Sequence, residues 1–193
     1  MQKKELQLPN TAVLESELRR ERNRLLKSFA IRKVLNIILI IGIILFFVCS
    51  IKFGVIQIYD NAMEPVLENG QLLIVIKGEE IQQGDLVAIS MGNTTVVKRV
   101  IGEPLDEVDI KKDGTVLLNK QELKEQYISK KMLGETDLSY PYQVPAYRYF
   151  VMGDHREASF DSRNSRFGCI AQEQIIGKAV ICIWPLNKIG LME

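Results

Sequence analysis

Residues 34–51, VLNIILIIGIILFFVCSI, form a long apolar run that contains no charged side chain. A helix rises about 1.5 Å per residue, so these residues as a helix are just long enough to cross a hydrocarbon core about 30 Å thick. A cleaved secretory signal would have a shorter apolar core and a small-residue cleavage site, whereas this run continues into KFGVIQIYD. The sequence therefore predicts a transmembrane helix in a lipid bilayer, in preference to a buried core helix.

Basic side chains lie mainly before this run. Residues 1–33 carry nine Lys or Arg and four Glu, and only Lys52 follows the run closely. The positive-inside bias places the N-terminus in the cytoplasm and the chain after residue 52 outside. The basic segment also has apolar residues at helical spacing, so it either extends the helix as a solvated segment or touches anionic lipid. The net charge of the whole chain is only +1, which excludes nucleic-acid binding as an expected function.

The rest of the chain has the pattern of a mainly β, antiparallel domain. Short apolar or alternating runs are separated by turn residues: LLIVIK, DLVAIS, TTVVKRVI, EVDIKKDGTVLLNKQEL, YRYFVMGD and IIGKAVICIWP. Asp113-Gly114 between two such arms predicts a hairpin. We therefore expect three parts: a cytoplasmic, helical basic segment (1–33), a transmembrane anchor with a short linker (34–56), and an extracytoplasmic β domain (57–193).

Three cysteines do not make a disulfide framework. Cys49 lies inside the apolar run, where it acts as a small hydrophobe. Cys169 and Cys182 can pair only if they lie on neighbouring strands, and the sequence leaves that pairing open.

Lys98 is the first candidate for chemistry. In TTVVKRVIG the period of two places Val96, Lys98 and Val100 on one face of a strand. If this face is buried, desolvation disfavours the ammonium and lowers the pKa of Lys98, which suits a general base. The alternative is an ordinary lysine in water on an edge strand.

The segment GDHREASFDSR, residues 153–163, is the second candidate. Asp161 and Arg163 can form a fixed ion pair, and Ser159 can orient a neighbouring amine by a hydrogen bond. His155 is the only histidine of the chain, so no cluster of histidines exists for a metal, and no triad order supports His155 as a general base. We expect neither a metal nor a cofactor.

These segments together resemble the motifs of one family. The chain resembles bacterial signal peptidase I, the membrane-anchored serine endopeptidase that removes signal peptides from exported precursors with a Ser/Lys dyad. The resemblance covers residues 34–190, and it implies a twisted antiparallel β domain with a hydrophobic surface resting on the plasma membrane. It rests on NAMEPVLENGQ against the family's S-M-x-P-T-L loop, GDLV, VVKRVIGEP against K-R-v-x-G-x-P-G-D, and GDHREASFDSR against G-D-N-R-x-x-S-x-D-S-R.

The resemblance also implies roles for single residues. By position, Lys98 is the general base, Ser159 orients it, and the Asp161–Arg163 pair braces the site. Met63 matches the methionine near the pocket for small side chains at the cleavage site. Ala62 stands where the nucleophilic serine belongs.

Ala62 removes the chemistry of this site, because a methyl group cannot attack a carbonyl. Losing the nucleophile of a serine protease costs about 10⁶ in turnover, or roughly 8 kcal/mol of barrier. Three further departures are Asp60 near the expected oxyanion hole, Val66 in place of a threonine and Leu105 in place of a glycine. A carboxylate beside a developing oxyanion opposes its stabilisation. One engineered Ser→Ala substitution explains none of the three, so the pattern favours a natural homologue that has lost the chemistry.

Lys98 can then be retained for a structural reason, because Asp60 can pair with it as a buried salt bridge. We also place Asp60, with Met63, among the expected peptide-binding residues. Rescue by another nucleophile, Asp60 or a nearby serine, is the alternative. We expect a non-cleaving member of the family that binds an extended peptide, signal peptide or surface-protein precursor and serves pilus-type surface assembly, since the family includes such relatives. The rival function is a genuine signal peptidase inactivated by engineering. Self-cleaving Ser/Lys repressors of similar fold would need a DNA-binding module where this chain has an apolar helix.

Overall fold

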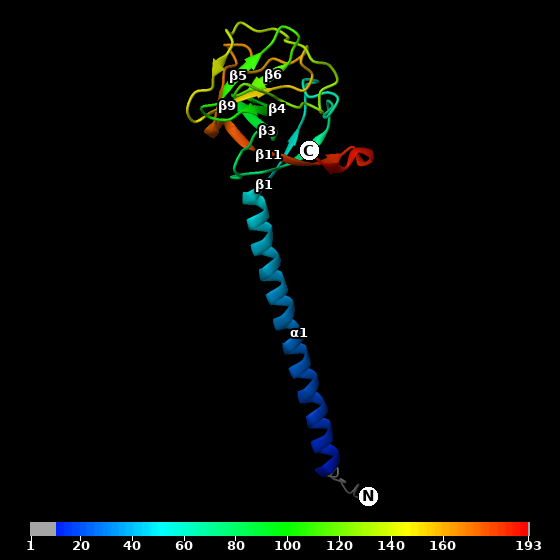
Figure 1. Cartoon of the computed structure of the whole chain (residues 1–193). Helices are drawn as coiled ribbons and strands as arrows, with labels where there is room; N and C mark the ends of the chain where they lie inside the picture. The colour runs from blue at the N-terminus through cyan, green and yellow to red at the C-terminus, as the bar shows by residue number, and fades with distance from the viewer. Residues whose placement is uncertain (1–10, 193) are drawn as a thin grey trace, which may run out of the picture. The chain divides into compact units, whose positions relative to one another are not determined.

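The structure is a computed structural model that describes residues 11–192. The chain divides into two compact units, residues 1–49 and 50–193, which are described separately. The first is dominated by helix α1, Thr11–Lys52 (Figure 1). The apolar part of α1 reaches a mean hydropathy of 3.0 over 18 residues and is not buried, so the helix is long and apolar enough to cross a membrane. The helix also includes the charged segment before the apolar run, as its helical spacing suggested.

The second unit is a mainly antiparallel β domain, as predicted. Its described residues form an eight-stranded sheet in the order β1-β2-β11-β3-β4-β9-β10, with β12 paired to β11, and a four-stranded sheet in the order β7-β6-β5-β8. The strands of the large sheet are β1 (Phe53–Gln57), β2 (Leu72–Ile76), β3 (Leu86–Met91), β4 (Thr94–Gly102), β9 (Arg148–Met152), β10 (Ile170–Ala171), β11 (Ile175–Trp184) and β12 (Gly190–Leu191).

The small sheet carries the predicted hairpin. Its strands are β5 (Glu107–Ile110), β6 (Val116–Leu118), β7 (Gln121–Glu122) and β8 (Tyr142–Gln143). Strands β5 and β6 pair antiparallel across the turn that contains Asp113-Gly114, and Gly114 has a φ of 85°, which a glycine adopts without strain. Two short 3₁₀ helices, Gln172–Gln174 and Leu186–Lys188, flank β11.

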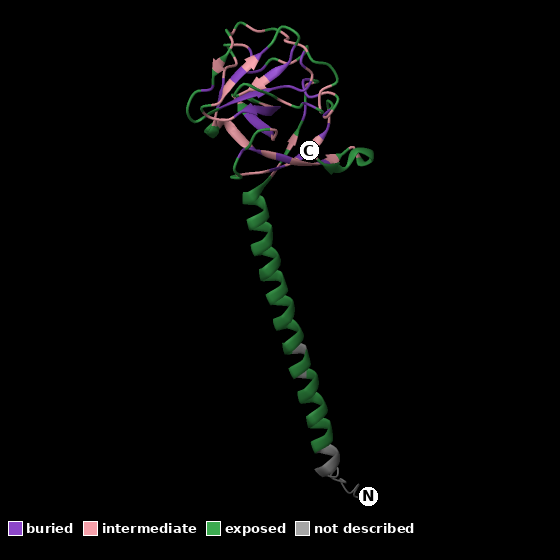
Figure 2. Ribbon diagram, in the orientation of Figure 1, coloured by how far each residue is buried: buried purple, intermediate pink, exposed green. Residues whose placement is uncertain are grey.

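Alternating apolar side chains explain why these segments form strands. In β2 the alternate residues Leu73 and Val75 are buried and their neighbours are half-buried. Strand β4 differs, because every residue from Val97 to Gly102 is buried. Both faces of β4 are therefore covered, and Figure 2 shows this burial concentrated in the strands of the domain. A lysine or arginine on such a strand needs partners inside the protein.

Two details of the fold bear on the sequence analysis. Strand β1 pairs with β2 and lies in the stretch that was expected to be a linker. Cys169 and Cys182 are buried and unpaired, and they belong to different hydrophobic clusters. The pairing that the sequence left open is therefore not formed.

Candidate active site

The loop that follows β1 brings Ala62 to the segment after β9. The backbone N–H of His155 donates to the carbonyl oxygen of Ala62 at 3.0 Å, and Ala62 is buried. Gly153 permits this close approach, because a Cβ built there would lie 2.4 Å from the Ala62 oxygen and 2.3 Å from Ser159 Oγ. The two segments that carry the resemblance are thus in direct contact.

Lys98 lies on β4 with only 2% of its side chain exposed. Burial lowers the pKa of Lys98 below its ordinary value, while the carboxylates of Asp60 and Asp161 oppose this shift. Lys98 Nζ and Asp60 Oδ2 are 3.8 Å apart, so the salt bridge that was hypothesised is present as a long ion pair. This distance exceeds that of a hydrogen bond. Lys98 therefore has the burial and the pKa direction of a general base, with a carboxylate beside it.

The expected Asp161–Arg163 ion pair is present and fully buried. Arg163 donates through Nε to Asp161 Oδ1 and through Nη2 to Oδ2, both at 2.8 Å. Asp161 Oδ2 also accepts the N–H of Gly153 at 2.9 Å, and Arg163 Nη1 donates to the Leu133 carbonyl at 2.7 Å. These hydrogen bonds fix the segment of residues 153–163, which contacts the Ala62 loop.

Ser159 is close to these groups but has no hydrogen bond to Lys98 in the structure. Its Oγ is buried and has no partner among the described residues. The hydroxyl lies near Gly153, where a Cβ would touch it. The orienting role that the resemblance implies therefore stays a prediction.

Arg99 and Asp154 form a second buried pair, which the sequence analysis missed. Arg99 donates through Nε and Nη2 to the two oxygens of Asp154 at 2.9 and 2.7 Å, and its guanidinium lies 3.9 Å from the centroid of the Tyr127 ring. Burial raises the pKa of Asp154, and the hydrogen bonds from Arg99 oppose that shift. The GDHR segment is thereby attached to the strand that carries Lys98.

Arg156 and Glu125 form a third buried pair. Arg156 Nε also donates to the Gly153 carbonyl at 3.1 Å. Glu125 lies in the charged stretch NKQELKEQYIS, where nothing in the pattern distinguishes it from a solvated residue. The sequence contains no signal for this pair, because the burial of Arg156 is visible only in the structure.

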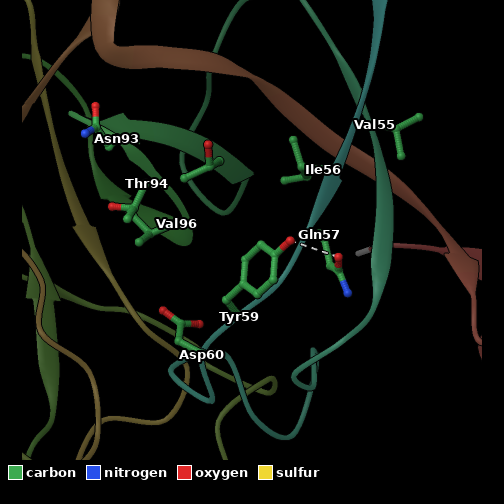
Figure 3. Close-up of a pocket in the computed structure, with 9 residues that line it drawn as sticks. Val55, Ile56, Gln57, Tyr59, Asp60, Asn93, Thr94 and Val96 are labelled. Atoms are coloured by element: carbon green, nitrogen blue, oxygen red, sulfur yellow. Dashed lines mark hydrogen bonds between the residues drawn. The ribbon is translucent and has the colours of Figure 1, made fainter.

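Two adjoining pockets lie at this site and share Asp60, Thr94 and Val96, and the smaller of them is lined by Ala62 and Lys98. One has a volume of about 380 Å³ and the other about 550 Å³. The smaller pocket is lined by Asp60, Asn61, Ala62, Met91, Thr94, Val96, Lys98, Ala158, Phe160 and Phe167. The larger lies between the β1 segment and the β3–β4 hairpin, as Figure 3 shows, and is lined by Val55, Ile56, Gln57, Tyr59, Asp60, Asn93, Thr94, Thr95 and Val96. We call the two pockets together the cleft.

Met63 lies in the core behind the Ala62 loop, and its expected role near the pocket for small side chains stays a prediction. It is fully buried, packs in a hydrophobic cluster with Leu67 and Leu73, and lines neither pocket. The side chain supports the Ala62 loop from the core side. Within residues 11–192, no group of three or more His, Cys, Asp or Glu side chains is placed to hold a metal ion.

Comparison with known proteins agrees with these motifs. The family model described as "Signal peptidase, peptidase S26" matches residues 31–184. Signal peptidase I T of Bacillus subtilis is 36% identical over 141 residues, which cover 66% of this chain and 72% of that protein. A signal peptidase I of Bacillus amyloliquefaciens is 30% identical over 183 residues, covering 89% of this chain and 98% of that protein. A crystal structure of a signal peptidase I from Enterococcus faecalis covers 52% of this chain and 97% of its own, with 28% identity and a TM-score of 0.44.

Proposed function

Because this chain belongs to the signal peptidase I family, we propose that its β domain binds extended peptides of exported precursors and does not cleave them. The observation that carries this proposal is Ala62 at the position of the family's nucleophile, in a cleft that also contains Lys98. A base without a hydroxyl to activate cannot form an acyl-enzyme. What remains is a binding cleft.

The form of the cleft supports peptide binding. Strand β1 is the last strand at one edge of the large sheet, and the larger pocket lies between its segment and the β3–β4 hairpin. An edge strand offers unpaired backbone groups to an extended chain, and a neighbouring pocket accepts its side chains. A bound precursor would therefore be held by strand pairing. In surface assembly of the pilus type, such a protein would hold a subunit precursor at the membrane.

Membrane attachment belongs to the same proposal. Helix α1 anchors the protein in the bacterial plasma membrane by its apolar part, with residues 1–33 in the cytoplasm and the β domain outside. The basic residues before the apolar run support this orientation.

One observation favours a second function, an authentic signal peptidase in which an engineered Ser→Ala substitution stands at Ala62. Lys98 is buried, its pKa is lowered, and the brace made by Asp161 and Arg163 is complete. A degenerate site has no catalytic reason to keep this arrangement. Asp60 argues the other way, since its carboxylate lies beside the base and near the expected oxyanion.

A precursor-cleavage assay tests the proposal. We expect the purified chain to bind a secretory precursor without cleaving it, and Ala62→Ser to remain about 10²-fold or more below an active signal peptidase, because Asp60 still opposes the oxyanion. Ala62→Ser combined with Lys98→Met controls for a contaminating host peptidase, since it lacks the base. Cleavage at an ordinary rate by the unmodified chain would overturn the proposal, and full activity of Ala62→Ser alone would favour the engineered enzyme.

A further inference from the structure

Asp60 lies at the junction of the two pockets of the cleft. It lines both of them, and 39% of its side chain is exposed. Figure 3 shows Asp60 and Tyr59 among the residues that line the larger pocket. The ring is 73% exposed, and its hydroxyl donates to Gln57 Oε1 at 2.9 Å, which holds the side chain against β1. A carboxylate and an aromatic face thus border the same space.

The carboxylate of Asp60 lacks the donors that a partly buried carboxylate needs. Among the described residues its one charged contact is Lys98 Nζ at 3.8 Å, and Oδ1 is buried without a hydrogen-bond partner. An ionised carboxylate has about four acceptor sites, and leaving them unfilled in a partly desolvated place is unfavourable. Because Oδ1 is buried, a bound ligand would meet this carboxylate at its exposed side, where a cationic donor would form a charge-assisted hydrogen bond.

The charge of the larger pocket indicates which donor it favours. Asp60 is the one ionisable acid or base among the residues that line it, apart from the phenol of Tyr59. Lys98 does not line this pocket, and only 2% of its side chain is exposed, so a cation in the pocket would face Asp60 and not the ammonium of Lys98. Ammonium and guanidinium groups bind aromatic faces as well as carboxylates.

We propose that the cleft selects peptides that place a lysine or arginine side chain against the Asp60 carboxylate and the Tyr59 ring. This inference rests on the proposed function, because it names the class of peptide that the same cleft binds. The competing explanation is that Asp60 serves only as the counter-ion of Lys98. That explanation leaves the exposed side of the carboxylate unused and predicts no preference for a charged peptide.

Peptide binding to the full chain in detergent micelles tests the inference. The probes are three fluorescein-labelled nonapeptides of alternating serine and valine that differ only at the central residue, which is lysine, glutamine or glutamate. We expect fluorescence polarisation to give a Kd for the lysine peptide about tenfold lower than for the glutamine peptide. Asp60→Asn should remove this difference, and Tyr59→Leu should reduce it by about twofold to fivefold. Asp109→Asn, in the small sheet, is the matched control and should keep the tenfold difference.

The outcomes separate this inference from the proposed function. Equal binding of all three peptides, or tighter binding of the glutamate peptide, would overturn cation selection and leave peptide binding intact. A preference for lysine that persists in Asp60→Asn would also overturn it. Failure of all three peptides to bind would contradict the proposed function itself. Asp60→Ser repeats the test with a second neutral side chain, and circular dichroism checks that each variant is folded.

Discussion

At the scale of single residues, Lys98 is a buried lysine whose desolvation is only weakly offset by neighbouring carboxylates. Among the described residues its nearest carboxylate oxygen is Asp60 Oδ2 at 3.8 Å, a distance that exceeds that of a hydrogen bond. The buried arginines differ, since Arg99 and Arg163 each form two short bonds with one carboxylate. Desolvation therefore dominates at Lys98 and lowers its pKa. The folded state disfavours the protonated form of this one side chain.

This imbalance predicts how stability depends on pH. Between the lowered pKa of folded Lys98 and its ordinary value of 10.5, the unfolded chain binds more protons than the folded chain. The free energy of unfolding should therefore gain a contribution that grows as pH rises through this window and is constant outside it. In Lys98→Met this contribution is absent, so the Tm difference between the two proteins should shift in favour of the unmodified chain at alkaline pH.

Thermal unfolding of the full chain in detergent between neutral pH and pH 10.5 measures this difference. Lys124→Met, which replaces an exposed lysine, is the control and should show a Tm difference that does not change with pH. Parallel curves for Lys98→Met and the unmodified chain would contradict the prediction.

The residues of the site were predictable to different extents. Lys98 could be predicted from the alternating pattern of β4 and from the family motif. The Asp161–Arg163 pair could be predicted from two opposite charges that lie two residues apart. Arg99–Asp154 and Arg156–Glu125 join residues 55 and 31 positions apart. Charges so distant in sequence show no pattern until the fold brings them together. The packing of Met63 in the core was not predictable from its place in the motif, and its expected role near bound peptide stays a prediction.

At the scale of elements, strand β11 joins the two halves of the large sheet, with β2 on one side and β3 on the other. Its pairing with β3 has an irregularity between Ile175 and Gly177. A Cβ at Gly177 would lie 2.4 Å from the backbone oxygen of Ile76 on β2. Backbone cannot yield as a flexible side chain does, so the two strands can approach this closely only because residue 177 is glycine.

Gly177→Ala should therefore lower the free energy of unfolding by about 1–3 kcal/mol, the usual cost of overpacking a filled interior. Gly190→Ala on the neighbouring strand β12 is the matched control, because no atom lies within 4 Å of a Cβ built there. Its effect should stay within about 0.5 kcal/mol. Denaturant unfolding of both variants measures the difference, and equal effects would show that the sheet adjusts at Gly177.

Most strands were recognisable because their apolar residues alternate or run continuously between turn residues. Strand β1 was missed because FGVIQ directly follows the apolar helix and gives no change of composition at Lys52. Strands β7, β8, β10 and β12 have two residues each, which is too short for a periodicity to be visible. The pairing of β11 between β2 and β3 depends on contacts distant in sequence, which local patterns do not contain.

At the scale of the whole molecule, the distribution of charge about α1 predicts an orientation in the membrane. An impermeant maleimide added to intact cells should label Lys124→Cys in the β domain and should not label Ser16→Cys before the apolar run. The native thiols give little background, because Cys49 lies in the proposed span and the other two are buried. Inverted vesicles are the control and should give the opposite result. Labelling of Ser16→Cys in intact cells would contradict the orientation.

The state of Cys169 and Cys182 has a consequence for how the protein responds to a reductant. Both thiols are buried and donate hydrogen bonds. Cys169 Sγ donates to the hydroxyl of Tyr142, and Cys182 Sγ donates to the carbonyl oxygen of Trp184. Burial raises the pKa of the Cys169 thiol, so the nucleophilic thiolate is disfavoured there. The described fold therefore holds no disulfide that a reductant could break, and we expect the Tm of the domain to be the same with and without dithiothreitol.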